Sequence, residues 1–202
     1  VALPDAIRDV DPFNLYPRGI LFDVRRNDET VGHHKVSFRK EVNDQVRVTS
    51  RLKLKVKVLG LIVYKYDYYS EAWWSGNHLV RLLAKQNDDG AISDVKVSAK
   101  ENVLMIDGPS GKFQGRPSLY PSNHWHAGVL VENQLIDTLK GQIASVKINN
   151  LGIEKVSAEG RVIHAQKYIY GGDIDAISWY DDFGRWIKLR FAAKDGSIIE
   201  YH

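Results

Sequence analysis

The sequence predicts an all-β protein, an antiparallel meander of about a dozen strands curled into a barrel or half-barrel. Apolar and polar residues alternate over long segments, turn signals recur at short spacing, and one stretch, Pro117–Asn133, breaks the pattern. The 202 residues, 44% of them hydrophobic, can bury a sizeable core. We therefore predict an irregular N-terminal arm over residues 1–17, which contains three prolines, and a single β domain over residues 18–202.

The segment Leu61–Gly90 is the centre of this prediction. It reads as two long strands joined by a tight turn at Ser75-Gly76. Because side chains alternate along a strand, Tyr64, Tyr66 and Tyr68 share one face, which is apolar in body and polar at its tips. Such a face suits either a filled core or a pocket that orients a ligand through a few hydroxyl groups.

The remaining strands follow from the same alternation. The clearest is Gln45–Leu59, where apolar residues occupy one face and mostly basic residues the other, as in a half-buried antiparallel strand. The other predicted strands are Ile20–Arg26, Thr30–Lys40, His78–Gln86, Ile92–Lys100, Val103–Ile106, Gln134–Thr138, Gln142–Asn149, Glu154–Ala158, Arg161–Tyr170, Ala176–Tyr180, Arg185–Ala193 and Ser197–Tyr201.

The stretch Pro117–Asn133 is predicted to form one short helix or lid segment near residues 122–132. Ser122 or Asn123 can cap a helix there, and Gly128 weakens it. A single helix among strands commonly plugs or covers one end of a barrel, so we expect this segment to close one end of the sheet.

Composition excludes several function classes. A net charge of +3 with dispersed basic residues does not indicate a nucleic-acid partner. The chain has no cysteine, which excludes disulfides, thiol nucleophiles and thiolate metal sites. No apolar run approaches the about 20 residues of a membrane helix, and nucleotide-cofactor and serine-hydrolase motifs do not occur. We expect no cofactor, and the sequence predicts no particular oligomeric state.

Two polar groups are candidates for chemistry. His124 and His126 would share a face if the segment is extended and could then bind a metal, whereas a helix places them apart, and the helical context leads us to predict no metal site. Glu71 lies beside Trp73, where a carboxyl group can act as a general acid, or can simply pair with a neighbouring strand. His33 and His34 point to opposite faces of one strand and are interpreted as ordinary strand histidines.

Short motifs along nearly the whole chain resemble those of an exported bacterial family of uncharacterised function. They are Val24-Arg25-Arg26 leading to Val31-Gly32-His33-His34, Glu71-x-Trp73-x-x-Gly76, Asp88-Asp89-Gly90, His124-Trp125, Leu135-Ile136-Asp137-Thr138-x-x-Gly141, Gly184-Arg185-Trp186-Ile187-Lys188-Leu189-x-Phe191 and Asp195-Gly196-Ser197-Ile198-Ile199-Glu200-Tyr201. The last two are the most specific.

The resemblance implies a signal peptide removed ahead of Val1, a periplasmic location and a curved antiparallel sheet similar to those of periplasmic lipid and lipoprotein carriers. It supplies no established activity, so no catalytic residue is carried over. The start at Val1 agrees with this, although a fragment boundary or removal of an export signal would both produce it.

Our first functional hypothesis is a periplasmic binding or carrier protein for an apolar or amphipathic, lipid-like ligand held on the concave face. The residues expected to bind it are Tyr64, Tyr66, Tyr68, Trp125, His164, Tyr168 and Trp179. The same aromatic residues can instead fill the interior without a ligand. The alternative is an enzyme acting on a glycan or small cyclic substrate, with Glu71 and His124 or His126 as acid and base. A third hypothesis is an envelope scaffold whose edge strand pairs with a partner, and each of them allows peripheral association with the envelope.

Overall fold

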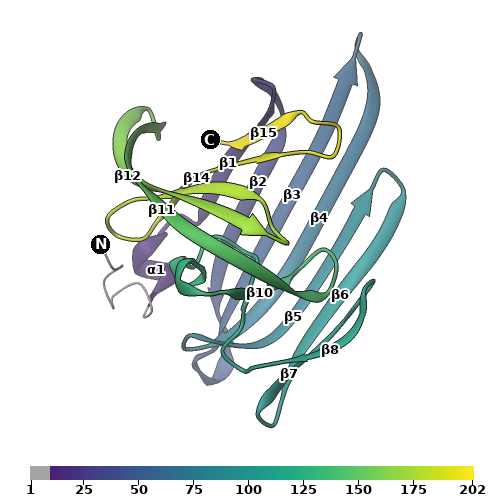
Figure 1. The fold of residues 1–202 in the computed structure, drawn as a ribbon, viewed down its shortest axis with the longest axis vertical. Helices are drawn as coiled ribbons and strands as arrows, with labels where there is room; N and C mark the ends of the chain where they lie inside the picture. The colour runs from purple at the N-terminus through teal and green to yellow at the C-terminus, as the bar shows by residue number, and fades with distance from the viewer. Residues whose placement is uncertain (1–9) are drawn as a thin grey trace.

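The computed structural model describes residues 10–202 and confirms the all-β prediction. One fifteen-stranded sheet contains every strand, in the order β8-β7-β6-β5-β4-β3-β2-β1-β15-β14-β13-β12-β11-β10-β9. Two meanders therefore meet where the first and last strands pair, with Val24 opposite Tyr201. The sheet is strongly curved around an interior that also holds the segment between β8 and β10 (Figure 1).

The first meander contains the longest regular alternation. Its strands are β1 (Ile20–Arg26), β2 (Glu29–Lys40), β3 (Val46–Val58), β4 (Leu61–Ser75), β5 (His78–Asp88), β6 (Ala91–Lys100), β7 (Val103–Gly108) and β8 (Gly111–Gly115). A one-turn helix, α1 (Pro12–Leu15), lies within the predicted N-terminal arm, of which residues 1–9 fall outside the described part. A 3-10 turn, η2 (Val42–Asp44), joins β2 to β3.

The second meander is more irregular. Its strands are β9 (Tyr120–Pro121), β10 (Gln134–Asp137), β11 (Gln142–Ala158), β12 (Arg161–Gly172), β13 (Ala176–Tyr180), β14 (Trp186–Ala192) and β15 (Ile198–Tyr201). Two segments that the sequence separates at Asn149-Asn150 form the single long strand β11, because an irregularity between Asn150 and Ile153 accommodates the turn signal within its ladder. β9 pairs with β10 in parallel.

The sheet is open, yet its two ends approach each other. The β7–β8 turn meets the β10–β11 turn, where the Ser110 amide donates to the Lys140 carbonyl oxygen over 3.0 Å. Glycines make this approach possible, since a Cβ on Gly108 would lie 2.8 Å from the Gly141 Cα. The structure thus decides between the two predicted architectures in favour of a half-barrel whose edges touch at one corner.

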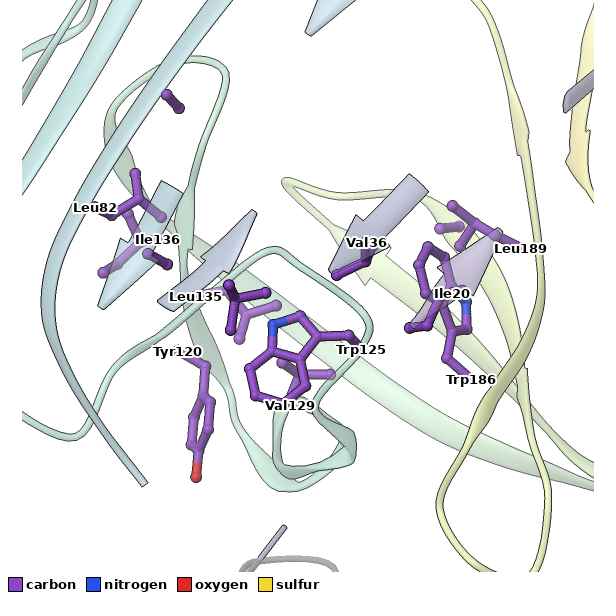
Figure 2. Packing of buried hydrophobic residues seen from close by; sticks show 14 of the residues in the cluster. Ile20, Val36, Leu82, Tyr120, Trp125, Val129, Leu135, Ile136, Trp186 and Leu189 are labelled. Atoms are coloured by element: carbon purple, nitrogen blue, oxygen red, sulfur yellow. The ribbon is translucent and has the colours of Figure 1, made fainter. Parts of the chain in front are cut away.

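The predicted lid lies inside the curve of the sheet. The expected helix over residues 122–132 is a shorter 3-10 helix, η3 (Ala127–Val131), capped by His126, whose ring Nδ1 accepts a hydrogen bond from the Gly128 amide. Leu119, Trp125 and Val129 are each at most 4% exposed and pack with apolar residues of the sheet and of β10 (Figure 2). The segment is therefore part of the core.

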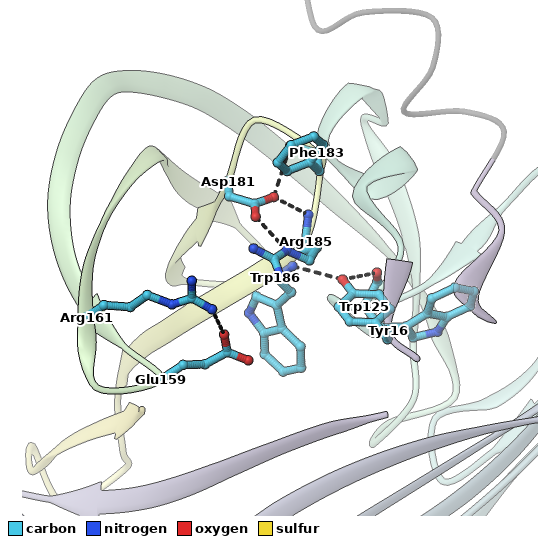
Figure 3. A network of polar contacts seen from close by, with 8 residues as sticks. All are labelled: Tyr16, Trp125, Glu159, Arg161, Asp181, Phe183, Arg185 and Trp186. Atoms are coloured by element: carbon cyan, nitrogen blue, oxygen red, sulfur yellow. Dashed lines mark hydrogen bonds and ion pairs between the residues drawn. The ribbon is translucent and has the colours of Figure 1, made fainter. Parts of the chain in front are cut away.

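The α1 turn is held to the interior by the Tyr16 hydroxyl. This group donates to the Trp125 carbonyl oxygen and accepts from the Trp186 amide, both over 2.9 Å (Figure 3). Beside it, buried Asp181 accepts hydrogen bonds from the amides of Phe183 and Arg185 and pairs with the Arg185 guanidinium. Tyr16 thus connects three distant segments of the chain.

We expect Tyr16→Phe to lower the free energy of unfolding by about 2–3 kcal/mol, because it leaves two buried backbone groups without a partner. Urea unfolding followed by tryptophan fluorescence measures the loss. Tyr168→Phe is the matched control, because the Tyr168 hydroxyl makes no hydrogen bond of normal geometry among the described residues and has the exposed Asn150 side chain beside it, so its removal should cost less than about 1 kcal/mol. Equal losses in the two variants would contradict the connecting role of Tyr16.

Candidate functional site: the concave face

The concave face of the half-barrel is the surface on which candidate residues gather. Strand register places Tyr66 of β4 beside Leu54 of β3, and Tyr68 beside Leu52 and Gln86. Further round the sheet, His34 of β2 is paired with Phe22 of β1, and Val24 of β1 with Tyr201 of β15. Side chains from both meanders therefore face one interior.

The predicted tyrosine row runs from the core toward an open end. Tyr68 is 7% exposed, whereas Tyr66 and Tyr64 are only half-buried. The Tyr64 hydroxyl donates to Asp88 over 2.7 Å, and the Tyr66 hydroxyl donates to the Gln86 side-chain oxygen over 3.1 Å. Half-buried Leu54 and Val56 continue the same face. The concave face is thus accessible near the β3–β4 hairpin and sealed farther down.

Buried polar atoms without partners lie at the inner end of this row. The Nδ1 atoms of His34 and His124 have no hydrogen-bond partner within residues 10–202, and the Tyr68 hydroxyl lies beside the Ser70 and Thr138 hydroxyls without a hydrogen bond of normal geometry to either. The other ring nitrogen of His34 contacts the Ser50 hydroxyl over 2.7 Å. Unsatisfied buried polar groups are uncommon and destabilising, so a cluster of them suggests a site for a polar ligand atom or water.

Burial determines the charge state of these groups. Desolvation lowers the pKa of His34 to about 3 and that of His124 to about 4, so both imidazoles are neutral. Desolvation also raises the pKa of Tyr68, and that of Tyr201 well above its ordinary value, so both phenols keep their protons. The inner wall therefore offers uncharged hydrogen-bonding groups.

Aromatic rings connect these groups across the interior. The His34 ring lies 5.2 Å from that of Tyr201 and 5.6 Å from that of Trp186, in edge-on arrangements. The His124 ring lies 5.3 Å from Trp186 and 5.3 Å from Tyr170. Sequence reasoning missed His34, Tyr201, Trp186 and Tyr170; a detectable signal was that His34 shares its strand face with Val36 and Phe38.

Other predicted ligand residues are placed differently. Tyr168 is 3% exposed on the concave face, and Trp125 is 4% exposed among Trp74 and Phe38. Trp179 lies on the opposite face, because it alternates with Ser178 and Tyr180, and it belongs to a separate buried cluster. His164 is exposed on the β11–β12 hairpin. The structure does not bring Trp179 or His164 to the tyrosine row.

The predicted acid–base pair is not assembled. Glu71 lies on the outer face of β4, where it pairs with Arg47 at 3.1 Å. His126 is buried and His124 is half-buried on the other side of the sheet, where their rings contact Tyr120 and Tyr170 respectively. Because the sheet lies between Glu71 and the two histidines, Glu71 and either histidine cannot act on one substrate.

Both ring nitrogens of His126 have neighbouring polar partners. Its Nδ1 accepts from the Gly128 amide and its Nε2 lies 3.4 Å from the Asn77 side-chain oxygen, while burial lowers its pKa to about 4. Within the described part of the chain, no group of three or more histidine or acidic side chains is arranged to hold a metal ion.

Comparison with known proteins identifies the family of the chain. Residues 22–202, from within β1 to the C-terminus, match the family described as a domain of unknown function, DUF6134. The chain belongs to the DUF6134 family. No curated protein matches it. The match of this DUF6134 chain includes the tyrosine row and the histidines of the concave face, and it confirms a family of unknown function, as the sequence motifs suggested.

A solved structure shares the fold of this DUF6134 protein. It is the crystal structure of a β-barrel-like protein of the domain of unknown function DUF1849 from Brucella abortus, with a TM-score of 0.60 over 89% of this chain and 92% of that one. At 10% identity the similarity shows the fold alone. Among residues 10–202 of the DUF6134 chain, no helix has the length and apolar character to cross a membrane.

Proposed function

We propose that this DUF6134 protein is a binding or carrier protein for an apolar or amphipathic, lipid-like ligand held on the concave face. The observation that carries the proposal is the row of tyrosines that runs from an accessible end to buried, unpartnered polar atoms. An apolar ligand body would contact Leu54, Val56 and Tyr66, and its polar group would reach the Tyr68 hydroxyl.

The charges around the row narrow the ligand class. Desolvation raises the pKa of Tyr66 and Tyr68, and the charges of Asp88 and Asp137 respectively raise it further by smaller amounts, so a carboxylate lies near each phenol. The Asp137 carboxylate is held by the amides of Leu139 and Lys140. Two carboxylates beside the row disfavour an anionic head group in the interior, so the proposed ligand is uncharged or weakly polar at its buried end.

Two measurements test the proposal. Native mass spectrometry of protein purified from cells should show a bound small molecule, and a fluorescent lipid probe should bind and be displaced by it. Tyr66→Ala should weaken probe binding about tenfold, because it removes much of the accessible apolar contact. Tyr69→Ala is the matched control, since Tyr69 lies on the same strand but on the outer face beside Arg51, and it should bind the probe as wild type does.

A protein that carries no ligand and binds no probe would show that the aromatic residues only fill the interior. Equal weakening by Tyr66→Ala and Tyr69→Ala would contradict binding at the concave face, because the two side chains lie on opposite faces of β4.

The periplasmic location that the sequence motifs imply remains part of this proposal. A carrier of lipid-like molecules is useful where such ligands must cross an aqueous compartment between membranes. Fractionation of cells that express the full gene, with an antibody against this domain, measures the location directly, and a cytoplasmic pool alone would contradict it.

A further inference from the structure

The β3–β4 hairpin extends beyond the rest of the sheet (Figure 1). The pairing of β2 with β3 ends at Leu54, and that of β5 with β4 ends at Tyr66. Beyond the Lys55–Lys65 pair the two strands therefore form a ribbon that pairs along its ladder only with itself. The base of the ribbon is tied to β5, because the Asp89 amide donates to the Lys65 carbonyl oxygen over 2.9 Å and the Tyr64 hydroxyl donates to Asp88. A free ribbon of this kind contributes little to the core.

The end of the ribbon is apolar and exposed. Leu59 at the turn is 98% exposed, and Leu61 is 72% exposed. Val58, Ile62 and Val63 are exposed by 54%, 45% and 53%. Single exposed apolar residues are ordinary on a protein surface, but five on one hairpin end form a contiguous patch of the kind that marks an interaction site.

Leu59 is also unusual for the backbone conformation that it adopts. Its φ is +51°, in the left-handed region that disfavours residues with a branched side chain. At Asn27, Asp89, Glu101 and Glu159, other turns of this chain place polar residues in the same region. A leucine at this position is therefore unfavourable for the backbone conformation of the turn and exposes an apolar side chain to water. Both costs indicate that Leu59 contacts another molecule.

The charges on the ribbon indicate what it contacts. Residues 45–66 contain six basic residues and no acidic one. Nearer the body of the sheet the cations have partners, since Arg47 pairs with Glu41 and Glu71, and Lys53 lies 3.7 Å from Asp67.

Toward the end of the ribbon the lysines have no anionic partner. Within residues 10–202, Lys55, Lys57 and Lys65 are all exposed and make no ion pair, and Lys55 lies directly opposite Lys65. Like charges opposite each other on neighbouring strands destabilise a sheet. An anionic surface would relieve that repulsion.

We propose that the end of the β3–β4 ribbon binds the surface of a membrane that contains anionic lipid, with Leu59 and its apolar neighbours in the interface and the three lysines at the phosphate groups. An apolar end flanked by cations matches the layered chemistry of such a surface. This surface is distinct from the ligand site of the proposed function, although it would place the open end of the concave face near the membrane.

Vesicle co-sedimentation of the whole chain tests the inference. Wild type should bind vesicles of phosphatidylcholine mixed with phosphatidylglycerol, should bind phosphatidylcholine alone at least about tenfold more weakly, and should be released in about 1 M salt, where screening acts within about 3 Å. Leu59→Asn should weaken binding about fivefold or more while keeping the fold, because asparagine tolerates the left-handed turn.

Two further variants complete the design. Leu21→Asn removes another exposed leucine, which is 68% exposed on β1, and should bind as wild type does. The triple change of Lys55, Lys57 and Lys65 to glutamine should reduce binding to the anionic vesicles by more than about tenfold. Absence of wild-type binding, equal binding to both vesicle types, or unchanged binding of Leu59→Asn would each overturn the inference.

The lipid probe assay of the proposed function separates the two ideas. Leu59→Asn should bind the probe on the concave face with wild-type affinity, since Leu59 does not line that face. Loss of vesicle binding with retained probe binding supports this inference independently of whether the natural ligand is a lipid.

Discussion

Acidification from pH 7.5 to pH 5 should lower the free energy of unfolding by up to about 6 kcal/mol, because three histidines of the interior, His126 fully buried and His34 and His124 half-buried, bind protons less readily in the folded chain than in the unfolded one. Burial lowers the pKa of His34 to about 3 and that of His124 and His126 to about 4. In the unfolded chain the same imidazoles titrate near their ordinary pKa of about 6.5.

The direction of the effect follows from proton uptake. Below pH 6.5 the unfolded chain binds protons that the folded chain excludes, so the free energy of unfolding falls as the pH falls through this window. At pH 5 each of these histidines contributes up to about 2 kcal/mol to the loss of stability, and the loss continues until the folded pKa is reached. For a chain of ordinary stability, about 5–15 kcal/mol, this is a large fraction of the total.

The full effect applies to His126, which is 2% exposed, whereas partial exposure of His34 and His124 makes about 2 kcal/mol the largest contribution expected from each of them. The His34 ring contacts Ser50, Trp186 and Tyr201, and His124 acts on it only to lower its pKa further. Carboxylates with a lowered pKa, such as Glu154 and Glu200, titrate below the chosen window and do not contribute between pH 7.5 and pH 5.

Urea unfolding at the two pH values measures the difference. His124→Gln should reduce the difference by up to about 2 kcal/mol, whatever it does to stability at pH 7.5, because a glutamine does not titrate. His78→Gln is the control, since His78 is exposed at the start of β5 and remains in water in both states. A difference that is unchanged by His124→Gln would show that this imidazole is not excluded from protonation in the folded chain.

Local sequence patterns predicted the strands and their inward faces in the half of the sheet where apolar and polar residues alternate regularly. The strands β3 and β4 follow the period of two over Val48–Val56 and Tyr64–Trp74, so the shared face of Tyr64, Tyr66 and Tyr68 could be read directly. The turn at Gly76 was equally clear, because its φ of +55° is one that glycine adopts without strain.

Where both faces of a strand are apolar, the sequence could not say which face is concave. In β13, Trp179 and Tyr180 are adjacent and both buried, yet only Tyr180 faces the main core. Trp179 is buried because its ring contacts Lys167 and Lys188 and its indole N–H donates to Glu154 of the long β11–β12 hairpin. Only the tertiary arrangement of that hairpin determines that Trp179 faces away from the main core.

The sequence could not show, for a related reason, that Glu71 and His124 lie on opposite sides of the sheet. Sequence adjacency placed it with Trp73, and the structure agrees that both lie on the outer face of β4. Whether that face meets His124 depends on the direction in which the sheet curves, which alternation alone does not encode. The contribution of His34 to the concave face was not predicted, because the rings that cover it belong to Trp186 and Tyr201, more than 150 residues along the chain.

We attribute part of that curvature to the glycine of the Val31-Gly32 motif. Gly32 lies opposite Leu54, and a Cβ at this position would be 1.8 Å from the Lys53 carbonyl oxygen, so the two backbones approach closely here. Glycine within a strand commonly marks a tight bend or a close backbone approach. Because His34 is only two residues away on the same face, the approach at Gly32 also positions the inner end of the candidate site.

Gly32→Ala should therefore lower the free energy of unfolding by at least about 3 kcal/mol, since backbone and not a flexible side chain must move. Thermal unfolding should show this as a midpoint lower by about 6–12 °C for a chain of this size. Gly171→Ala is the matched control, because Gly171 is also a strand glycine and a Cβ there meets no atom within 4 Å. Its expected change is below about 1 kcal/mol, since alanine also restricts the unfolded chain. Equal losses at the two positions would mean that the close approach of β2 and β3 does not set the curvature, and the placement of His34 on the concave face would then need another cause.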